Sequence, residues 1–287
     1  MEIISINLED YRRSGAGANG ESYDSIADNS VMMKLYNPDY PTDTIFSELD
    51  VARKVYELGV PSPEPGELVT DGQRIGIRFR RIVGKRSFSR MLADEPERYD
   101  ELTREFARCC LKLHSTECPD GMFPDAKPQF QALLDADVYL DARQKEKASA
   151  FLQSIPDART ALHGDLHIGN IISTLPFGAP LSQPHDLYFI DLGYFARGCP
   201  LLDLGMMRSV CITSDTEFRQ KEMHIDDILA AKVWASFVDE YFGGRFSVEE
   251  ADALIIPYQA LKCFLIEYNL NGSLTPNHVK LLRSVKW

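Results

Sequence analysis

The hydrophobic periodicity of the chain changes near residue 83, and this change restricts the possible fold more than any other feature. Before that point, short β-type runs alternate with turn signals, and Asp71-Gly72 marks a hairpin. Beyond it, apolar residues recur at the helical spacing. The pattern predicts an α+β chain with two lobes. We expect residues 1–83 to form a small antiparallel-sheet N-lobe, and residues 84–287 to form a larger, mainly helical C-lobe.

The turn signals and the apolar spacing also give approximate bounds for the elements. In the N-lobe we expect strands at 3–6, 21–27, 31–36, 67–70 and 75–83, and a helix at 44–58. In the C-lobe we expect helices at 97–114, 130–135, 141–153, 201–210, 226–242, 248–268 and 276–285, with short strands at 171–174 and 187–190.

Charge and cysteine usage narrow the range of partners and compartments. The net charge of −12 disfavours nucleic acid or an anionic membrane surface as a general partner, so a cationic or neutral substrate is expected. The six cysteines show neither a CxxC pair nor zinc-type spacing, which indicates buried thiols in a reducing compartment. No basic start precedes a long apolar run, and no apolar stretch reaches membrane-spanning length. We therefore expect a cytoplasmic protein without a membrane partner.

A glycine-rich stretch, GAGANG, places glycines at Gly15, Gly17 and Gly20. This G-x-G-x-x-G pattern occurs in dinucleotide-binding folds and in kinase phosphate loops, although a flexible surface loop would also explain it. A dinucleotide-binding motif needs a helix after its glycines, whereas here a strand, a turn and another strand follow. The context favours the kinase version, in which residues without Cβ let backbone amides approach phosphate oxygens.

Lys34 lies within an apolar strand, VMMKLY, where a charge needs an explanation. Its ammonium either reaches solvent from an edge strand or pairs with a carboxylate and the phosphates of a nucleotide. The helix expected at 44–58 carries Glu48 beside its buried face. We prefer Glu48 as the partner of Lys34. The alternative is that Glu48 only pairs with a surface neighbour four residues away on its own helix.

The stretch ALHGDLHIGNII at 161–172 places Asp165 and Asn170 five residues apart in a loop, and IDLG at 190–193 adds Asp191 after a second apolar run. This is the layout of a phosphoryl-transfer site, in which one acid accepts a hydroxyl proton while an amide and another acid hold a metal ion. The alternative is that HGD is a polar turn and Asp191 a turn residue at the end of a strand.

These motifs occur in one order: GAGANG, Lys34, Glu48, HGDLHIGN and IDLG. The ordered set resembles the protein-kinase-like fold, and HGD with Asn five residues after the Asp is similar to the aminoglycoside phosphotransferase and choline kinase branch. The later RGCPLLDLG is similar to that family's G-[DC]-P-x-x-D-L-[AG] stretch and places Asp203 at the start of a helix. The resemblance spans nearly the whole chain.

For the nucleotide, the resemblance implies ATP. The loop from Gly15 to Gly20 would cover the triphosphate, Lys34 would hold the α- and β-phosphates, and Glu48 would hold Lys34. Backbone groups near Ile82 and Gly84 would meet the adenine.

For the transfer, the resemblance implies that Asp165 orients the acceptor hydroxyl and accepts its proton. Asn170 and Asp191 would bind Mg²⁺, which prefers hard oxygen ligands. His163 would be structural and fix the loop by hydrogen bonding. His167 invites a metal or general-base role, but no further ligands can be located, so neither histidine is expected to be catalytic.

The expected activity is phosphorylation of a hydroxyl on a small molecule such as an aminoglycoside, a sugar or an amino alcohol. Leu192 stands where protein kinases have Phe, and the segment that anchors a peptide-substrate loop is missing, so a Ser/Thr protein kinase is less favoured. A catalytically silent nucleotide-binding module is the other alternative. Trp234, Phe237 and Tyr241 have the spacing of a core stripe, so no acceptor residue beyond Asp165 is named.

Overall fold

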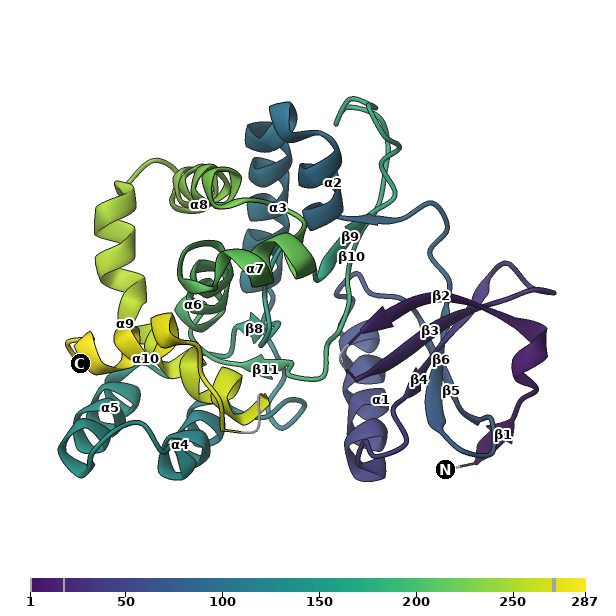
Figure 1. The fold of residues 1–287 in the computed structure, drawn as a ribbon, viewed down its shortest axis with the longest axis horizontal. Helices are drawn as coiled ribbons and strands as arrows, with labels where there is room; N and C mark the ends of the chain where they lie inside the picture. Colours follow the sequence, from purple (N-terminus) through teal and green to yellow (C-terminus); the bar gives the residue numbers. More distant parts are fainter. Residues whose placement is uncertain (1, 18, 270–271) are drawn as a thin grey trace. The chain divides into compact units, whose positions relative to one another are not determined.

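The computed structural model describes residues 2–17, 19–269 and 272–287. Its internal contacts divide the chain into two compact units (Figure 1). The first unit contains Met1–Arg86 and Ile172–Gly193, and the second contains Ser87–Ile171 and Tyr194–Trp287. The sequence placed residues 172–193 in the helical lobe. They belong to the first unit because their backbone forms hydrogen bonds with it. For example, Phe189 N donates to Pro61 O at 2.8 Å.

The first unit is built on a six-stranded sheet with the order β1-β5-β6-β4-β3-β2. Its pairings are antiparallel except that β1 runs parallel to β5, with Ile3 opposite Leu68. The sheet is therefore mixed, where the sequence predicted an antiparallel one. Parallel neighbours need a long crossover, and here β2, β3, β4 and helix α1 lie between the two strands in the chain. The strands are β1 (Ile3–Ser5), β2 (Tyr11–Gly17), β3 (Gly20–Ser25), β4 (Val31–Tyr36), β5 (Pro65–Thr70) and β6 (Ile75–Arg80).

The glycine-rich stretch is the tip of the β2–β3 hairpin. Strand β2 includes Gly15 and Gly17, and Gly17 lies opposite Gly20 in the register. Ala18, inside the predicted phosphate loop, lies outside the described residues. The prediction of a loop from Gly15 onward was wrong for its first half, because glycines depress strand propensity and so concealed the end of β2.

Both faces of the sheet are covered by apolar side chains. Helix α1 (Thr42–Glu57) packs Ile45 and Leu49 against Tyr36, Leu68 and Ile77 on one face. A second cluster lies among the strands and contains Tyr23, Met33, Leu35 and Val69. Strand β4 contributes to both clusters because successive side chains point to opposite faces. It is consequently a buried, central strand.

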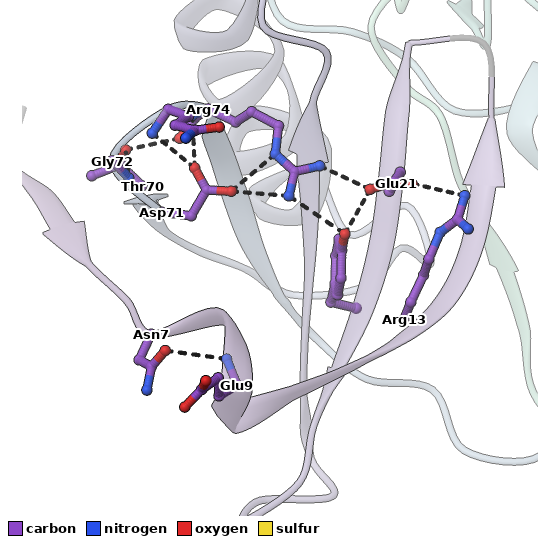
Figure 2. A network of polar contacts seen from close by, with 10 residues as sticks. Asn7, Glu9, Arg13, Glu21, Thr70, Asp71, Gly72 and Arg74 are labelled. Carbon is purple, nitrogen blue, oxygen red and sulfur yellow. Dashed lines mark hydrogen bonds and ion pairs between the residues drawn. The ribbon is translucent and has the colours of Figure 1, made fainter.

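The β2–β3 hairpin is held by a polar network between its middle and its tip (Figure 2). Glu21 accepts hydrogen bonds from Tyr23 Oη at 2.6 Å and from Arg74 at 2.8 Å, and it pairs with Arg13 at 2.7 Å. Arg74 in turn donates to Asp71 at 2.9 Å. The hydrogen bonds from Tyr23 and Arg74 lower the pKa of Glu21. The network connects β2 and β3 to the β5–β6 turn.

The second unit is mainly helical, as the sequence predicted. Within it, α3 packs against α8 and α6 packs against α9, and the two-residue strands β8 (Ala161–Leu162) and β11 (Ala196–Arg197) pair antiparallel. Its α-helices are α2 (Phe88–Asp94), α3 (Tyr99–His114), α4 (Ala126–Ala136), α5 (Ala142–Ser154), α6 (Leu201–Arg208), α7 (Thr216–Phe218), α8 (Asp227–Phe242), α9 (Val248–Asn269) and α10 (Pro276–Ser284).

A small sheet with the order β10-β9-β7 contains β7 (Arg86–Ser87), β9 (Ile171–Ser173) and β10 (Leu187–Phe189). Helix α7 and the π-helical turns on either side of it, Ser209–Thr213 and Arg219–Met223, were not predicted, since this polar stretch shows no clear apolar period. Among the described residues, no helix has the length and apolar character needed to cross a membrane.

Candidate functional site

In the first unit, Lys34 lies between two carboxylates. Its Nζ is 3.0 Å from Glu48 Oε1 and 3.2 Å from Asp191 Oδ1. Strand β4 is paired on both sides, by β3 and by β6, so Lys34 is not on an edge strand. The edge-strand explanation of this lysine is thereby wrong. The structure brings together three of the residues that the sequence singled out.

The electrostatics of this cluster favour a charged lysine. Burial alone would lower the pKa of Lys34, but the neighbouring carboxylates of Asp191 and Glu48 outweigh it and raise that pKa. The ammonium also lies 4.8 Å from the centre of the Tyr36 ring, a cation–π distance. Lys34 therefore carries its charge throughout the physiological pH range.

Asp191 has an unusual backbone conformation. It follows β10, and its φ of 60° makes it one of two described non-glycine residues, with His224, in the left-handed region. Asp tolerates this region better than most residues, but strain of this kind tends to persist at functional positions. The side chain of Asp191 is 52% exposed, so its carboxylate is accessible while it pairs with Lys34.

The glycines of the hairpin differ in how much space surrounds them. A Cβ added to Gly20 would lie 2.2 Å from Leu35 O, whereas one on Gly15 would make ordinary contact and one on Gly17 would meet nothing within 4 Å. The β3–β4 pairing therefore requires glycine at position 20. At Gly15 and Gly17 no such close contact exists, and Gly15 lies where the register of β2 and β3 shifts after Arg13.

The residues expected near adenine lie in the connection between β6 and β7. Ile82 is half-buried, and Gly84 is exposed with a φ of +70°, which a turn with glycine adopts at little cost. Their contact with a nucleotide base stays a prediction.

In the second unit, Asp165 and Asn170 lie in the loop between β8 and β9. The amide nitrogen of Asn170 donates to Asp165 O at 2.9 Å and lies 3.4 Å from Asp165 Oδ2. Asp165 N donates to Nδ1 of the buried His163 at 3.3 Å, and Gly169 N donates to His167 Nδ1 at 3.0 Å. Both histidines thus accept hydrogen bonds from the loop backbone, in agreement with a structural role.

The start of this loop is anchored by Asp203 on α6, which is completely buried. Its carboxylate accepts hydrogen bonds from His163 N at 2.7 Å and from Gly164 N at 2.9 Å, and it lies 3.2 Å from His114 Nε2. Burial would raise the pKa of Asp203, but the hydrogen bond from His114 and the charge of Lys262 lower it overall. Asp203 therefore remains an acceptor that fixes the loop backbone.

His114 and Lys262 were missed as members of this anchor. Lys262 donates to Gly164 O at 2.5 Å from helix α9. A signal for it existed: Lys262 lies alone in the apolar run ALKCFLI, as Lys34 does in VMMKLY. His114 gave no comparable signal, because a histidine in the last turn of a helix is common.

The aromatic stripe of α8 belongs to the core, as predicted. Trp234 and Phe237 are buried with stacked rings 5.9 Å apart, and Tyr241 stacks on Phe237 at 5.4 Å. Glu240, on the same helix, pairs with Arg104 and Arg108 of α3. These residues have structural partners.

Comparison with known proteins agrees with the kinase-like motifs. A model of the phosphotransferase enzyme family matches residues 10–235, which is most of the chain. A search of curated protein sequences finds no match.

Several solved structures have a similar fold at low sequence identity. A thermostable mutant of aminoglycoside phosphotransferase APH(4)-Ia, in a ternary complex with ADP and hygromycin B, has a TM-score of 0.58 at 12% identity, covering 96% of this chain and 94% of that one. APH(3'')-Id from Streptomyces rimosus, in complex with ADP and streptomycin, has a TM-score of 0.54 at 17% identity, covering 89% and 93%. The similarity shows a protein-kinase-like fold.

Proposed function

Because this chain belongs to the phosphotransferase enzyme family, we propose that it is an ATP-dependent kinase that phosphorylates a hydroxyl group of a small molecule. The observation that carries the proposal is that Lys34, on the central strand β4, contacts both Glu48 and Asp191. In kinases a lysine held by a helix carboxylate binds nucleotide phosphates, and this pair must be in place for activity.

On the nucleotide side, Lys34 binds the α- and β-phosphates and Glu48 keeps its ammonium in position. The backbone of the Gly15–Gly20 hairpin tip covers the triphosphate, with Gly15 and Gly17 allowing close approach. Residues near Ile82 and Gly84 receive the adenine. The pairing of Lys34 with two carboxylates supports this assignment, because phosphate oxygens and carboxylates make similar charge-assisted hydrogen bonds to an ammonium.

On the acceptor side, Asp165 orients the hydroxyl and takes its proton. The hydroxyl oxygen forms a bond to the γ-phosphorus, the bond from that phosphorus to the β–γ bridging oxygen breaks, and ADP leaves with the electron pair. The hydrogen bond from Asn170 to Asp165 O and that from Asp165 N to His163 support this role, because they hold the loop in one conformation.

Asp191 and Asn170 each carry an oxygen of the kind that magnesium prefers. Asp191 offers an accessible carboxylate, and the amide nitrogen of Asn170 is engaged by Asp165, which leaves the amide oxygen as its ligand atom. In the described parts of the chain, no group of three or more His, Cys, Asp or Glu side chains is arranged to hold a metal ion. Magnesium is usually bound by one or two protein oxygens together with phosphates and water. When bound, it neutralises charge on the phosphates.

For the acceptor we propose an aminoglycoside, a sugar or an amino alcohol. Three similar structures contain streptomycin, hygromycin B or kanamycin, and the net charge of −12 suits a cationic acceptor. A cytoplasmic location would supply ATP and magnesium together.

The test is ADP release in the presence of ATP, Mg²⁺ and a panel of hydroxyl compounds. Asp165→Asn should lower turnover of any accepted compound by about 10²–10⁴-fold while leaving ATP affinity unchanged. Asp157→Asn is the control, because Asp157 is 95% exposed in a surface pair with Lys127, and it should match the unmodified protein. Full turnover by Asp165→Asn would remove Asp165 from the chemistry. Stabilisation by ATP without transfer to any acceptor would favour a silent nucleotide-binding module.

A further inference from the structure

Lys262 is a buried cation to which the proposed reaction assigns no role. It lies on α9, and only 2% of its surface is exposed. Its Nζ donates to Gly164 O at 2.5 Å and lies 4.0 Å from Asp203 Oδ1. Removing an ammonium from water costs several kcal/mol unless strong contacts offset the loss. A buried lysine at this position therefore calls for a specific explanation.

The contact falls on the peptide bond that leads into Asp165. Gly164 O belongs to this peptide and accepts from Lys262, while its N–H, that of Asp165, donates to His163 Nδ1 at 3.3 Å. The preceding peptide N–H, that of Gly164, donates to Asp203 Oδ1 at 2.9 Å. Successive backbone groups are thus held by side chains from α6, α9 and the loop itself. This fixes the backbone from which the Asp165 side chain extends.

The space around Lys262 leaves its ammonium little room for another position. Its ammonium lies 5.1 Å from the centre of the Phe130 ring on α4. The cavity beside it, lined in part by Gln129, Gly164 and Tyr194, has a volume of about 20 Å³, which is room for about one water molecule. Gly164 is itself fixed, with a φ of +85°, and a Cβ there would lie 2.0 Å from Tyr194 O.

Burial and the neighbouring carboxylates act on Lys262 in opposite directions. Burial lowers the pKa of Lys262 overall, although the carboxylates of Asp203 and Asp165 oppose that effect. Neutralising Asp203 would by itself be a purely structural reason for the lysine. However, Asp203 already lies beside His114 and accepts two backbone hydrogen bonds, and the shorter contact of Lys262 is the one to Gly164 O.

We propose that Lys262 is a positioning residue for phosphoryl transfer, which sets the orientation of Asp165 by holding the Gly164 carbonyl. This inference rests on the proposed role of Asp165 as proton acceptor. A misplacement of about 1 Å in a reacting group can cost about 10²-fold in rate. Loss of the Lys262 contact should therefore lower kcat and leave nucleotide binding intact.

The experiment compares Lys262→Met with Gln259→Met in the full-length protein. Methionine keeps much of the lysine volume without its charge. Gln259 is equally buried on the same helix but donates to Thr213 at 2.7 Å instead of contacting the loop, so its replacement controls for lost stability. Both variants are measured by thermal unfolding, by steady-state kinetics with ATP, and by hydrogen exchange of backbone amides at 163–170.

Lys262→Met is expected to lower kcat by about 10²-fold with KM for ATP unchanged, and to speed exchange of the 163–170 amides. Gln259→Met is expected to lower Tm while kcat and loop exchange stay as in the unmodified protein. Unchanged loop exchange in Lys262→Met would overturn the proposal, and so would equal losses of kcat in both variants. If the unmodified protein transfers phosphate to no acceptor, the proposed function fails, and loop exchange alone still decides whether Lys262 holds the loop.

Discussion

Lys34 Nζ lies 3.2 Å from Asp191 Oδ1, and this contact links the central strand β4 to the segment just after β10. The two residues are 157 positions apart in the sequence but belong to the same compact unit. Lys34 is thus shared by two carboxylates, one of them on α1. A bound triphosphate would compete with Asp191 for the ammonium.

Replacing Lys34 by Met should reduce kcat/KM for ATP by about 10²–10³-fold, because a charge aimed at the phosphates is lost. Steady-state kinetics with varied ATP would measure the effect. Lys54→Met is the matched control, since Lys54 pairs with Asp50 on the outer side of α1. Identical nucleotide kinetics for Lys34→Met and Lys54→Met would exclude Lys34 from the site.

Asp191→Asn should raise the Mg²⁺ concentration needed for half-maximal turnover and lower the maximal rate, because a charged ligand is removed. Asn tolerates the left-handed region, so this variant should lose only the stability that the ion pair with Lys34 contributes. Asp191→Ala should lose about 1 kcal/mol more stability through backbone strain. Magnesium titrations and thermal unfolding would check both effects, and an unaltered Mg²⁺ dependence in Asp191→Asn would contradict a ligand role.

Gly20→Ala should destabilise the first unit by about 1–3 kcal/mol, because its Cβ would collide with Leu35 O and force β3 away from β4. Gly17→Ala should change stability by less than about 0.5 kcal/mol, since that position has space for a methyl group. Chemical denaturation separates the two variants. If Gly17→Ala keeps its stability but weakens ATP binding, glycine at 17 serves the ligand; equal stability losses would contradict the difference in packing.

The carboxyl group of Glu267 should make the free energy of unfolding decrease as pH rises through a defined range. Burial, together with a hydrogen bond and charge repulsion from Asp137, raises its pKa from 4.5 to about 7. Between these values the folded chain binds more protons than the unfolded chain, so the free energy of unfolding decreases as pH rises, by at most about 1.4 kcal/mol per pH unit. Below the range both states are protonated, and above it the loss is complete.

Glu267→Gln should remove this slope and be more stable than the unmodified protein at pH 8. Denaturation at several pH values between 4 and 8 would test it. Glu249→Gln, at an exposed position on the same helix, should retain the slope. A slope that persists in Glu267→Gln would show that another group titrates.

The sequence predicted the local elements well where periodicity was strong. The helix expected at 44–58 is α1, and its apolar stripe correctly placed Glu48 near Lys34. The spacing of apolar residues specifies which face of a helix is buried, so a polar residue at the edge of that face can be assigned a neighbour. The order of the motifs similarly indicated the family from the sequence alone.

Long-range pairings could not be predicted in the same way. Lys262 and Gly164 are 98 positions apart, and the contact depends on how α9 packs beside the loop. The parallel position of β1 and the membership of residues 172–193 in the first unit depend likewise on tertiary packing. Local propensity carries no information on which distant segment an edge strand or loop will meet.

The parallel pairing of β1 with β5 has a consequence for handling the protein. Strand β1 occupies the outer side of β5, where Ile3 to Ser5 lie opposite Leu68 to Thr70. Without it, β5 would present its unpaired amide and carbonyl groups as a template for the strands of other molecules. Truncation past Ser5 should therefore promote self-association, and an affinity tag is better joined to this end by a linker that leaves Ile3 to Ser5 intact.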